Sequence, residues 1–297
     1  MRFHIELLSQ IHNALDLEKP KNPLISVIDM SKFKVKDTWI DIKYSSSLYT
    51  ITLKDESCGM EYGRNTYDFQ EGVMSFIAPE QVFRIKTKPY QKINGWMLNF
   101  HPELIRNTAL GMKMNQLNFF SYNTHEALHL SEQEQETVTN CIKMIDSEIQ
   151  ERIDRHSNSV IVSSLELFFN YCIRFYERQF HTRASENKDI LSKVEFLLKQ
   201  YYSKDIRLKG LPTVSYLAEN VNLSPGYLSD LLKNETGKSA KEHINLHLIE
   251  KAKIILLNSN LSVSEIAYDL GFEYPQHFSK MFKSKTGMSP TQYRNVS

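Results

Sequence analysis

The chain has 297 residues, 41% of them hydrophobic and 24% charged, which is enough for two globular domains with buried cores and excludes a disordered protein. The net charge of +1 hides an imbalance, because residues 187–297 hold 15 Lys and Arg against 11 Asp and Glu. This mildly basic C-terminal part is compatible with phosphate contacts, and equally with an ordinary solvated surface.

Three cysteines, Cys58, Cys141 and Cys172, have no paired spacing, which is typical of a protein in a reducing compartment. Polar residues interrupt the start of the chain before the core of a signal peptide can form. No later run approaches the roughly 20 apolar residues of a membrane span. We therefore expect a soluble, cytoplasmic protein with no membrane contact.

Residues 24–100 show the pattern of short strands. Runs such as LISVID, SLYTITLK and GWMLNF alternate apolar with polar residues or carry β-branched and aromatic ones, and turn-rich segments separate them. The pattern predicts a small antiparallel barrel or sandwich. Its aromatic residues either line a site for an organic ligand or pack in the core. These residues are Trp39, Tyr44, Tyr49, Tyr62, Phe76, Phe83 and Trp96.

A helical pattern begins at Ser131, which forms a capping box with Glu134. Apolar residues then recur at three- and four-residue steps in two successive segments. They predict an antiparallel helix pair that packs on the barrel. Its apolar surface also suits pairing with a second subunit, and the sequence does not separate the two uses. The first segment contains Val138, Cys141, Ile142, Ile145, Ile149 and Ile153, and the second contains Val160, Ile161, Ser164, Leu165, Phe168, Tyr171, Cys172 and Phe175.

The motif HEALH at 125–129 has the spacing of a zinc protease site, which needs both histidines on one face of a helix. The residues before the motif are not helical, and a new helix is capped two residues after it. We therefore expect His125 and His129 in a strand or loop. We predict no metal site and no cofactor.

The polar segment HTRASENKD at 181–189 is predicted to be a linker. Beyond it, TVSYLAENVNLSPGYLSDLLK at 213–233 returns as SVSEIAYDLGFEYPQHFSKMFK at 262–283, with the same apolar skeleton. Two copies are too few for a solenoid, so each copy must be a small fold in itself. Each predicts a helix, a tight turn at Asn222 or Gly271, and a second helix, which together make a helix-turn-helix.

A helix-turn-helix exposes the N-terminal part of its second helix to the DNA major groove. Inward positions match between the copies and most outward positions differ, as expected of two readers of different bases. The outward residues, with the lysines that suit phosphates, are Gly226, Tyr227, Ser229, Asp230 and Lys233 in the first copy and Gln276, His277, Ser279, Lys280 and Lys283 in the second. One helix capped at Ser239 joins the copies, so that one subunit can read two adjacent grooves.

The second copy, IAYDLGFEYPQHFSKMFKSKTGMSPTQYR, resembles the C-terminal domain of the AraC-type (AraC/XylS) family of bacterial transcription regulators. The resemblance covers residues 190–297 and implies binding to double-stranded DNA. The sequence departs from the family pattern at Asp230 and Lys280, which replace a basic residue and an Arg, and at Leu248, which replaces an Arg on the joining helix. Fewer strong phosphate or guanine contacts should follow.

Regulators of this family often carry a cupin-like sensory barrel, and FQEGVMSFIAPEQVF resembles a turn of that barrel. Residues 40–100 contain no His, so metal catalysis is not expected there. The predicted fold is α+β. It has a cupin-like β-barrel with a helix pair in residues 1–180, a linker at 181–189, and an all-α domain with two helix-turn-helix motifs joined by a linker helix in residues 190–297.

We interpret the chain as a sequence-specific DNA-binding transcription regulator that is modulated by a small-molecule effector and acts as a homodimer. The alternative is a small-molecule or peptide binding protein whose helical domain has lost affinity for DNA. A protein-interaction module of two packed helical hairpins is a weaker interpretation, because it does not explain why the turns and caps match between the copies. The sequence shows neither a paired nucleophile and base nor a Gly-rich phosphate loop, so nothing in it indicates an enzyme.

Overall fold

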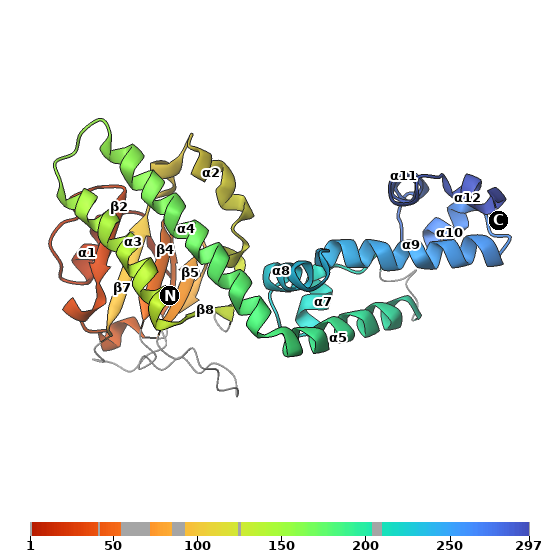
Figure 1. Ribbon diagram of the computed structural model, residues 1–297, viewed down its shortest axis with the longest axis horizontal. Helices are drawn as coiled ribbons and strands as arrows, with labels where there is room; N and C mark the ends of the chain where they lie inside the picture. Colours follow the sequence, from red (N-terminus) through yellow and green to blue (C-terminus); the bar gives the residue numbers. More distant parts are fainter. Residues whose placement is uncertain are drawn as a thin grey trace. The chain divides into compact units, whose positions relative to one another are not determined.

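The computed structural model describes residues 2–40, 42–54, 72–84, 93–123, 126–203 and 210–296. The chain divides into two compact units, Met1–Gln179 and Phe180–Ser297. Figure 1 shows that the first unit is built on β-sheet and the second from helices. None of the helices in the described segments combines the length and the apolar composition that a membrane crossing requires.

The described strands of the N-terminal unit form two sheets. The five-stranded sheet is antiparallel throughout in the order β2-β7-β4-β5-β8, and the three-stranded sheet has the order β1-β3-β6 with β1 parallel to β3. The strands are β1 Arg2–Ile5, β2 Ile25–Asp29, β3 Lys43–Ser46, β4 Tyr49–Lys54, β5 Gly72–Ile77, β6 Phe83–Arg84, β7 Gly95–Phe100 and β8 Leu128–Leu130. A mixed sheet and helix fold is confirmed, but the described strands do not close into a barrel.

The helices of this unit include the predicted pair. They are α1 Leu8–Ala14, α2 Ala109–Lys113, α3 Glu132–Gln150 and α4 Ser157–Thr182, with short 3-10 helices at Met30–Lys32, Asp37–Trp39, Pro102–Ile105, Met114–Gln116 and Asn118–Ser121. Ser131 caps α3 as predicted: its hydroxyl accepts from the Glu134 N–H at 3.3 Å, and its own N–H donates to the Glu134 carboxylate at 3.0 Å. The apolar stripe was predicted to continue to Ile153, but α3 ends at Gln150 and the Ile153 side chain is exposed.

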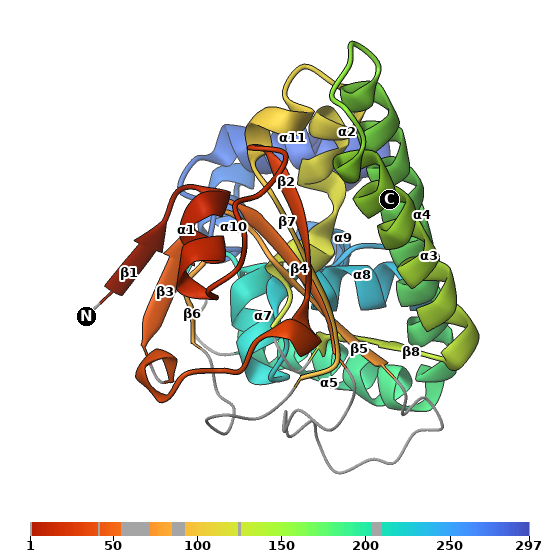
Figure 2. The same cartoon turned by 90° about the vertical axis from the view of Figure 1, so that its left-hand side faces the viewer.

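Helices α3 and α4 lie along one side of the five-stranded sheet (Figure 2). Aromatic rings fill the contact. Trp96 of β7 meets Phe168 of α4 at 6.0 Å between ring centroids, and Phe76 of β5 meets Phe119 at 4.5 Å. Phe76 and Trp96 pair with Ile51 and Leu53 of β4. Tyr49 lies two and four residues before these two, so its side chain is on the same face of the sheet. Three residues predicted to line a ligand site therefore belong to the core beneath the helices.

The remaining residues of that predicted set lie elsewhere. The Tyr44 and Phe83 rings stack at 5.7 Å in the three-stranded sheet, and the Tyr44 hydroxyl donates to the Trp39 carbonyl at 3.3 Å. Tyr62 lies outside the described residues. The described aromatic residues therefore do not share one lining, and for Tyr49, Phe76 and Trp96 the contacts agree with the alternative of core packing. Strand alternation separates the two faces of a strand but does not show which face the helices cover.

The opposite face of the five-stranded sheet carries several buried polar side chains. Ser26, Asn99 and Thr50 are cross-strand partners, so their side chains share this face, and Thr52 follows two positions along β4. The Thr50 hydroxyl donates to Asn99 Oδ1 at 2.9 Å, and His12 Nε2 lies 2.7 Å from the Ser26 hydroxyl. The amide Nδ2 of fully buried Asn99 has no hydrogen-bond partner among the described residues.

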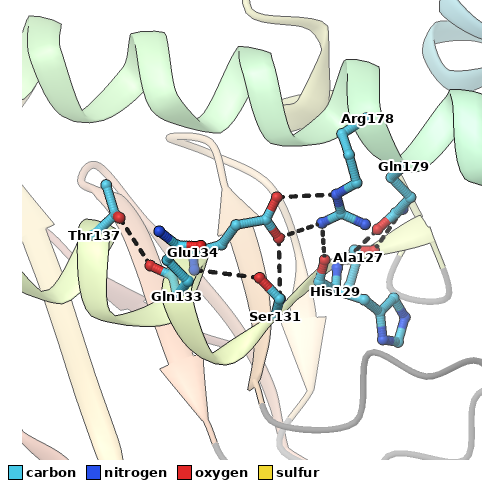
Figure 3. A network of polar contacts seen from close by, with 8 residues as sticks. All are labelled: Ala127, His129, Ser131, Gln133, Glu134, Thr137, Arg178 and Gln179. Atoms are coloured by element: carbon cyan, nitrogen blue, oxygen red, sulfur yellow. Dashed lines mark hydrogen bonds and ion pairs between the residues drawn. The ribbon is translucent and has the colours of Figure 1, made fainter.

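The end of α4 is fastened to the edge strand β8 (Figure 3). Arg178 donates to both carboxylate oxygens of Glu134 at 2.7 and 3.0 Å and to the His129 carbonyl at 2.6 Å. The side-chain amide of Gln179 accepts from the His129 N–H at 2.8 Å and donates to the Ala127 carbonyl at 3.2 Å. Gln179 thus satisfies the backbone of β8 as a further strand would.

Part of the HEALH motif takes part in this arrangement. His129 lies in β8, as predicted, and Glu126 is buried with its carboxylate accepting from the Asn123 N–H at 2.6 Å. His125 lies outside the described residues. Nowhere in the described segments do three His, Cys, Asp or Glu side chains gather as metal ligands would.

The C-terminal unit is helical, including much of the segment predicted as a linker. Its helices are α5 Ala184–Ser203, α7 Val214–Asn220, α8 Pro225–Thr236, α9 Ala240–Asn258, α10 Val263–Asp269, α11 Pro275–Thr286 and α12 Pro290–Val296. Residues 181–189 belong to the end of α4 and the start of α5, with only Arg183 between them. The segment is polar but contains neither Gly nor Pro, so nothing in it opposes a helix.

The internal repeat extends beyond the two helix-turn-helix segments at 213–233 and 262–283. Thr236 and Thr286, at the ends of α8 and α11, donate to carbonyls four residues earlier at 2.7 and 2.8 Å. A glycine in the left-handed conformation follows each. Ser239 and Ser289 then form matching caps at the starts of α9 and α12. Each copy is therefore a three-helix unit, with α12 as the short counterpart of α9.

Candidate nucleic-acid interface

Both copies contain the predicted tight turn between two helices. Asn222 follows α7 with φ of 57°, and Gly271 follows α10 with φ of 86°, a region that Asn and Gly enter at the lowest cost. In the first copy Ser224 then caps α8, accepting from the Tyr227 N–H at 3.2 Å, with Pro225 in the first helical position. The turns and this cap confirm the helix-turn-helix reading of the sequence.

The second motif has an aromatic core beneath a polar surface. Phe278 and Phe282 of α11 are fully buried, and Phe278 contacts Phe272 at 5.4 Å while Phe282 contacts Tyr293 of α12 at 5.4 Å. Arg294 of α12 donates to the carbonyls that end α9 and precede α10, at 3.1 and 2.7 Å. These contacts fix α11 in place, so that its outer side is a rigid surface.

The predicted reading residues of this motif lie on that surface. Gln276, His277, Lys280 and Lys283 are exposed, and Ser279 is half-buried between them. All five come from α11, and the first two lie in its first turn. A helix N-terminus with exposed amide and cationic side chains has the chemistry that base edges and phosphates require.

The first motif presents fewer of its predicted residues. Gly226, Ser229 and Asp230 are half-buried, and Lys233 is exposed. Tyr227, which was predicted to face outward, is buried.

The Tyr227 prediction was wrong because a distant residue covers that face of α8. Tyr227 is only 4% exposed, and its ring packs on that of Phe180 at 5.0 Å. Asn187 of α5 donates to the Phe180 carbonyl at 2.8 Å and to Glu235 of α8 at 3.0 Å. The last residues of α4 and the start of α5 therefore pack on α8, which no pattern inside the repeat shows.

The joining helix α9 begins at the predicted cap. The Ser239 hydroxyl accepts from the Glu242 N–H, and hydrogen bonds from Ser239 hold the pKa of the Glu242 carboxyl below its usual value. Leu248, where the family pattern has an Arg, is fully buried. It contributes to the core of the unit rather than to any surface.

A pair of tyrosines, which sequence reasoning missed, connects the segment beside the turn of the second motif with α9. The Tyr201 hydroxyl donates to the Gly210 carbonyl at 3.1 Å, and Gly210 lies so close to Gly271 that a Cβ on Gly271 would be 2.9 Å from the Gly210 carbonyl carbon. Lys251 of α9 donates to the Tyr202 carbonyl. The pair lies at the end of α5, where the only sequence signal is the dipeptide itself.

Two histidines on α9 have surroundings that lower their pKa below the usual value. Burial is the largest cause that lowers the pKa of His243 and of His247, and nearby lysines lower both further. The His247 ring stacks on Tyr202 at 5.2 Å. The charged neighbours that act on one or both imidazoles are Lys199, Lys238, Lys251, Glu195 and Glu242.

We expect the C-terminal unit to lose stability as the pH falls below about 6.5. Above that pH the folded and unfolded states both hold neutral imidazoles. Below it, the unfolded chain binds protons that the folded state resists, so the free energy of unfolding falls. Urea unfolding followed by far-UV circular dichroism measures this loss, and replacing His243 and His247 by Gln should flatten the profile. An unchanged profile would assign the pH sensitivity to other groups.

The C-terminal part of the chain matches a known domain. Residues 217–295 match the profile described as a helix-turn-helix domain. The uncharacterized HTH-type transcriptional regulator YfiF of Bacillus subtilis is 29% identical over 148 residues, covering 50% of this chain and 44% of the relative. The Msm operon regulatory protein of Streptococcus mutans is 31% identical over 110 residues, 37% of each chain. The chain thus spans less than half the length of both curated relatives.

Among solved structures, the C-terminal domain of the two-component response regulator yesN from Fusobacterium nucleatum is 33% identical. The match covers 34% of this chain and 96% of that chain, with a TM-score of 0.30.

The two motifs, their shared joining helix and their repeated caps define a double helix-turn-helix domain. Residues 217–295 are a helix-turn-helix domain of the AraC type, which confirms the predicted resemblance for this part of the chain.

Proposed function

We propose that the protein is a sequence-specific DNA-binding regulator of transcription, in which α11 and α8 each enter one segment of the major groove. The observation that carries the proposal is the outer face of α11, where Gln276 and Lys280 are exposed above buried Phe278. Gln pairs with adenine and Lys with guanine at their major-groove edges. The relatives named above are described as transcription regulators rather than enzymes, which supports the same function.

The two motifs contribute unequally in this proposal. The second supplies most of the base readout, because its reading side chains are longer and more exposed. The first offers Ser229 and Asp230, which suit a cytosine amino group or either purine, and Lys233, which suits a phosphate. Since Tyr227 is buried in the core, it is not among the residues that we assign to DNA contact.

Selection from random duplex DNA with the full-length protein tests this proposal, followed by footprinting of the enriched sequences at two salt concentrations. Protection of two adjacent major-groove segments per subunit, weakening steeply with salt, is the expected result. No enrichment by folded protein, with or without candidate effectors, would favour the other interpretation, a binding protein whose helical domain has lost affinity for DNA.

Substitution of single lysines separates base readout from phosphate contact. Lys280→Ala should cost about 1–3 kcal/mol at one base pair and relax specificity there. Lys233→Ala should weaken binding to all sequences alike and reduce the salt slope by about one. Lys19→Ala, which removes an exposed lysine of the N-terminal unit, is the charge-matched control. Equal losses on all sequences for Lys280→Ala would reassign that residue to phosphate contact.

We further propose that the N-terminal unit is a cupin-like sensor for a small-molecule effector. The buried polar face with Ser26, Thr50 and Asn99 supports this better than the aromatic residues do, because the Asn99 amide keeps a donor without a partner among the described residues. Asn99→Leu should abolish the response of DNA binding to an effector found by ligand screening. An unchanged response would move the effector site elsewhere.

The same proposal includes a cytoplasmic homodimer. The helix pair keeps four apolar side chains exposed, Met144 on α3 and Val160, Leu167 and Ile173 on α4. A second copy of this chain would cover such side chains and bring two readers to two half-sites. Sedimentation equilibrium of the full chain tests the dimer, and a monomer at micromolar concentration would contradict it.

A further inference from the structure

The two reading helices begin in different ways. In the first copy Ser224 is buried and caps α8 with its hydroxyl. The equivalent position of the second copy is Tyr274, whose side chain makes no capping hydrogen bond to α11. Both residues have extended backbone and precede a proline, so the position itself permits a cap. Helix α11 therefore lacks the side-chain cap that stabilises α8, its counterpart in the first copy.

The Tyr274 side chain is not used in the core instead. It is 57% exposed, whereas Phe272, Phe278 and Phe282 of the same motif are buried. Its ring meets the ring of His277 edge-on, with centroids 5.5 Å apart and planes at 63°. An exposed aromatic pair thus stands at the start of α11, beside Gln276.

This placement is informative because the first turn is the part of a reading helix that meets base edges. The major groove presents one strongly apolar group, the C5-methyl of thymine, and apolar side chains recognise thymine by packing on it. A tyrosine ring supplies a rigid apolar surface, and the contact with His277 limits the positions that the ring can take.

We propose that Tyr274 is a specificity-determining residue of the second motif, and that its ring packs on the methyl group of a thymine next to the base read by Gln276. His277 acts as a positioning residue for the ring. The inference rests on the proposed DNA-binding function and adds a base preference that the amide and lysine side chains of α11 do not provide.

The test compares binding of the full chain to selected duplexes in which each thymine in turn is replaced by deoxyuridine, which removes only the methyl group. For the unmodified protein, one position should lose about fourfold in affinity, the factor that burial of one methyl group gives. Tyr274→Phe should show the same loss. Tyr274→Ser, which restores the cap seen at Ser224, should bind thymine and uracil equally well at that position.

Stability provides the second readout. Tyr274→Ser should melt at a higher temperature than the unmodified protein, because it gains a helix cap, while it binds the selected duplex more weakly. A purely structural role for Tyr274 would move both quantities in the same direction. His277→Ala should reduce the methyl preference without abolishing binding.

Several results would overturn the inference. A methyl preference that survives in Tyr274→Ser, or its absence from the unmodified protein, would do so. Tyr274→Phe behaving like Tyr274→Ser would show that the hydroxyl contacts a phosphate instead. If the unmodified protein enriches no sequence, the proposed function fails and this inference with it. Steep salt dependence and sequence preference without a methyl effect would remove this inference alone.

Discussion

Replacing Gly271 with Ala is expected to lower the free energy of unfolding of the second helix-turn-helix motif by about 2–4 kcal/mol. Gly271 has a φ of 86°, where an alanine loses roughly 1–2 kcal/mol. The new Cβ would also lie 2.9 Å from the carbonyl carbon and 3.1 Å from the carbonyl oxygen of Gly210. Those atoms are backbone and cannot rotate away, so overpacking adds to the conformational cost.

The first copy supplies the control for this prediction. Asn222 occupies the same turn with a φ of 57°, and Asn tolerates this conformation. Gly271→Asn therefore removes most of the conformational penalty and keeps the steric one, whereas Asn222→Gly should change stability by less than about 1 kcal/mol. Hydrogen exchange of α10 and α11 in the full chain measures the effect locally.

If Gly271→Asn were as stable as the unmodified chain, the close approach to Gly210 would impose no steric cost on a side chain at position 271. The conformation of the turn alone would then explain the glycine. If Gly271→Asn instead loses about 1–3 kcal/mol, the close approach of the two backbone segments is part of what positions the second motif.

The helices of the C-terminal unit could be predicted from sequence because their signals are local. Apolar spacing, the left-handed turn at Asn222 or Gly271, and the caps at Ser224 and Ser239 each act within a few residues. The repeat strengthened these signals, since the same positions had to serve the same purpose twice. The residues that face outward on α11 followed from the same pattern.

The errors arose where residues distant in sequence meet. Tyr227 looks like an outward residue within its own motif, and only Phe180 from the end of α4 shows that it is buried. The edge of the sheet is completed by Gln179, far along the chain from β8. Trp96 of β7 packs against Phe168 of α4, a pairing that the strand pattern alone does not show. Periodicity contains no information on such pairings.

The two motifs are similar in sequence but differ in which surfaces they leave exposed. The position of Tyr227 corresponds to His277 in the second copy, yet the first is buried and the second exposed. Helices α4 and α5 use part of the surface of α8 for packing, and α11 has no such cover among the described residues. The surface left free for DNA is therefore larger on the second motif, which is why we assign most of the base readout to it.

Gln179→Ala should destabilise the N-terminal unit by about 2–4 kcal/mol. Gln179 is 1% exposed, and its amide satisfies both the His129 N–H and the Ala127 carbonyl (Figure 3). Truncation leaves two backbone groups without a partner, and each unsatisfied buried group costs roughly 1–3 kcal/mol. Both tryptophans of the chain, Trp39 and Trp96, lie in this unit, so tryptophan fluorescence in urea reports its unfolding.

Three variants separate the hydrogen bonds from the volume of the side chain. Gln179→Met fills the space without polar atoms and should cost nearly as much as Gln179→Ala. Gln179→Glu keeps the acceptor for His129 but buries a carboxylate beside the Ala127 carbonyl, and should cost more. Glu177→Ala changes an exposed residue of the same turn and should shift stability by less than about 0.5 kcal/mol. A loss in Gln179→Ala no larger than in Glu177→Ala would mean that water replaces the side chain at the strand edge. The contacts of Arg178 with Glu134 and the His129 carbonyl, which involve no atom of Gln179, would then be enough to hold the end of α4 against β8.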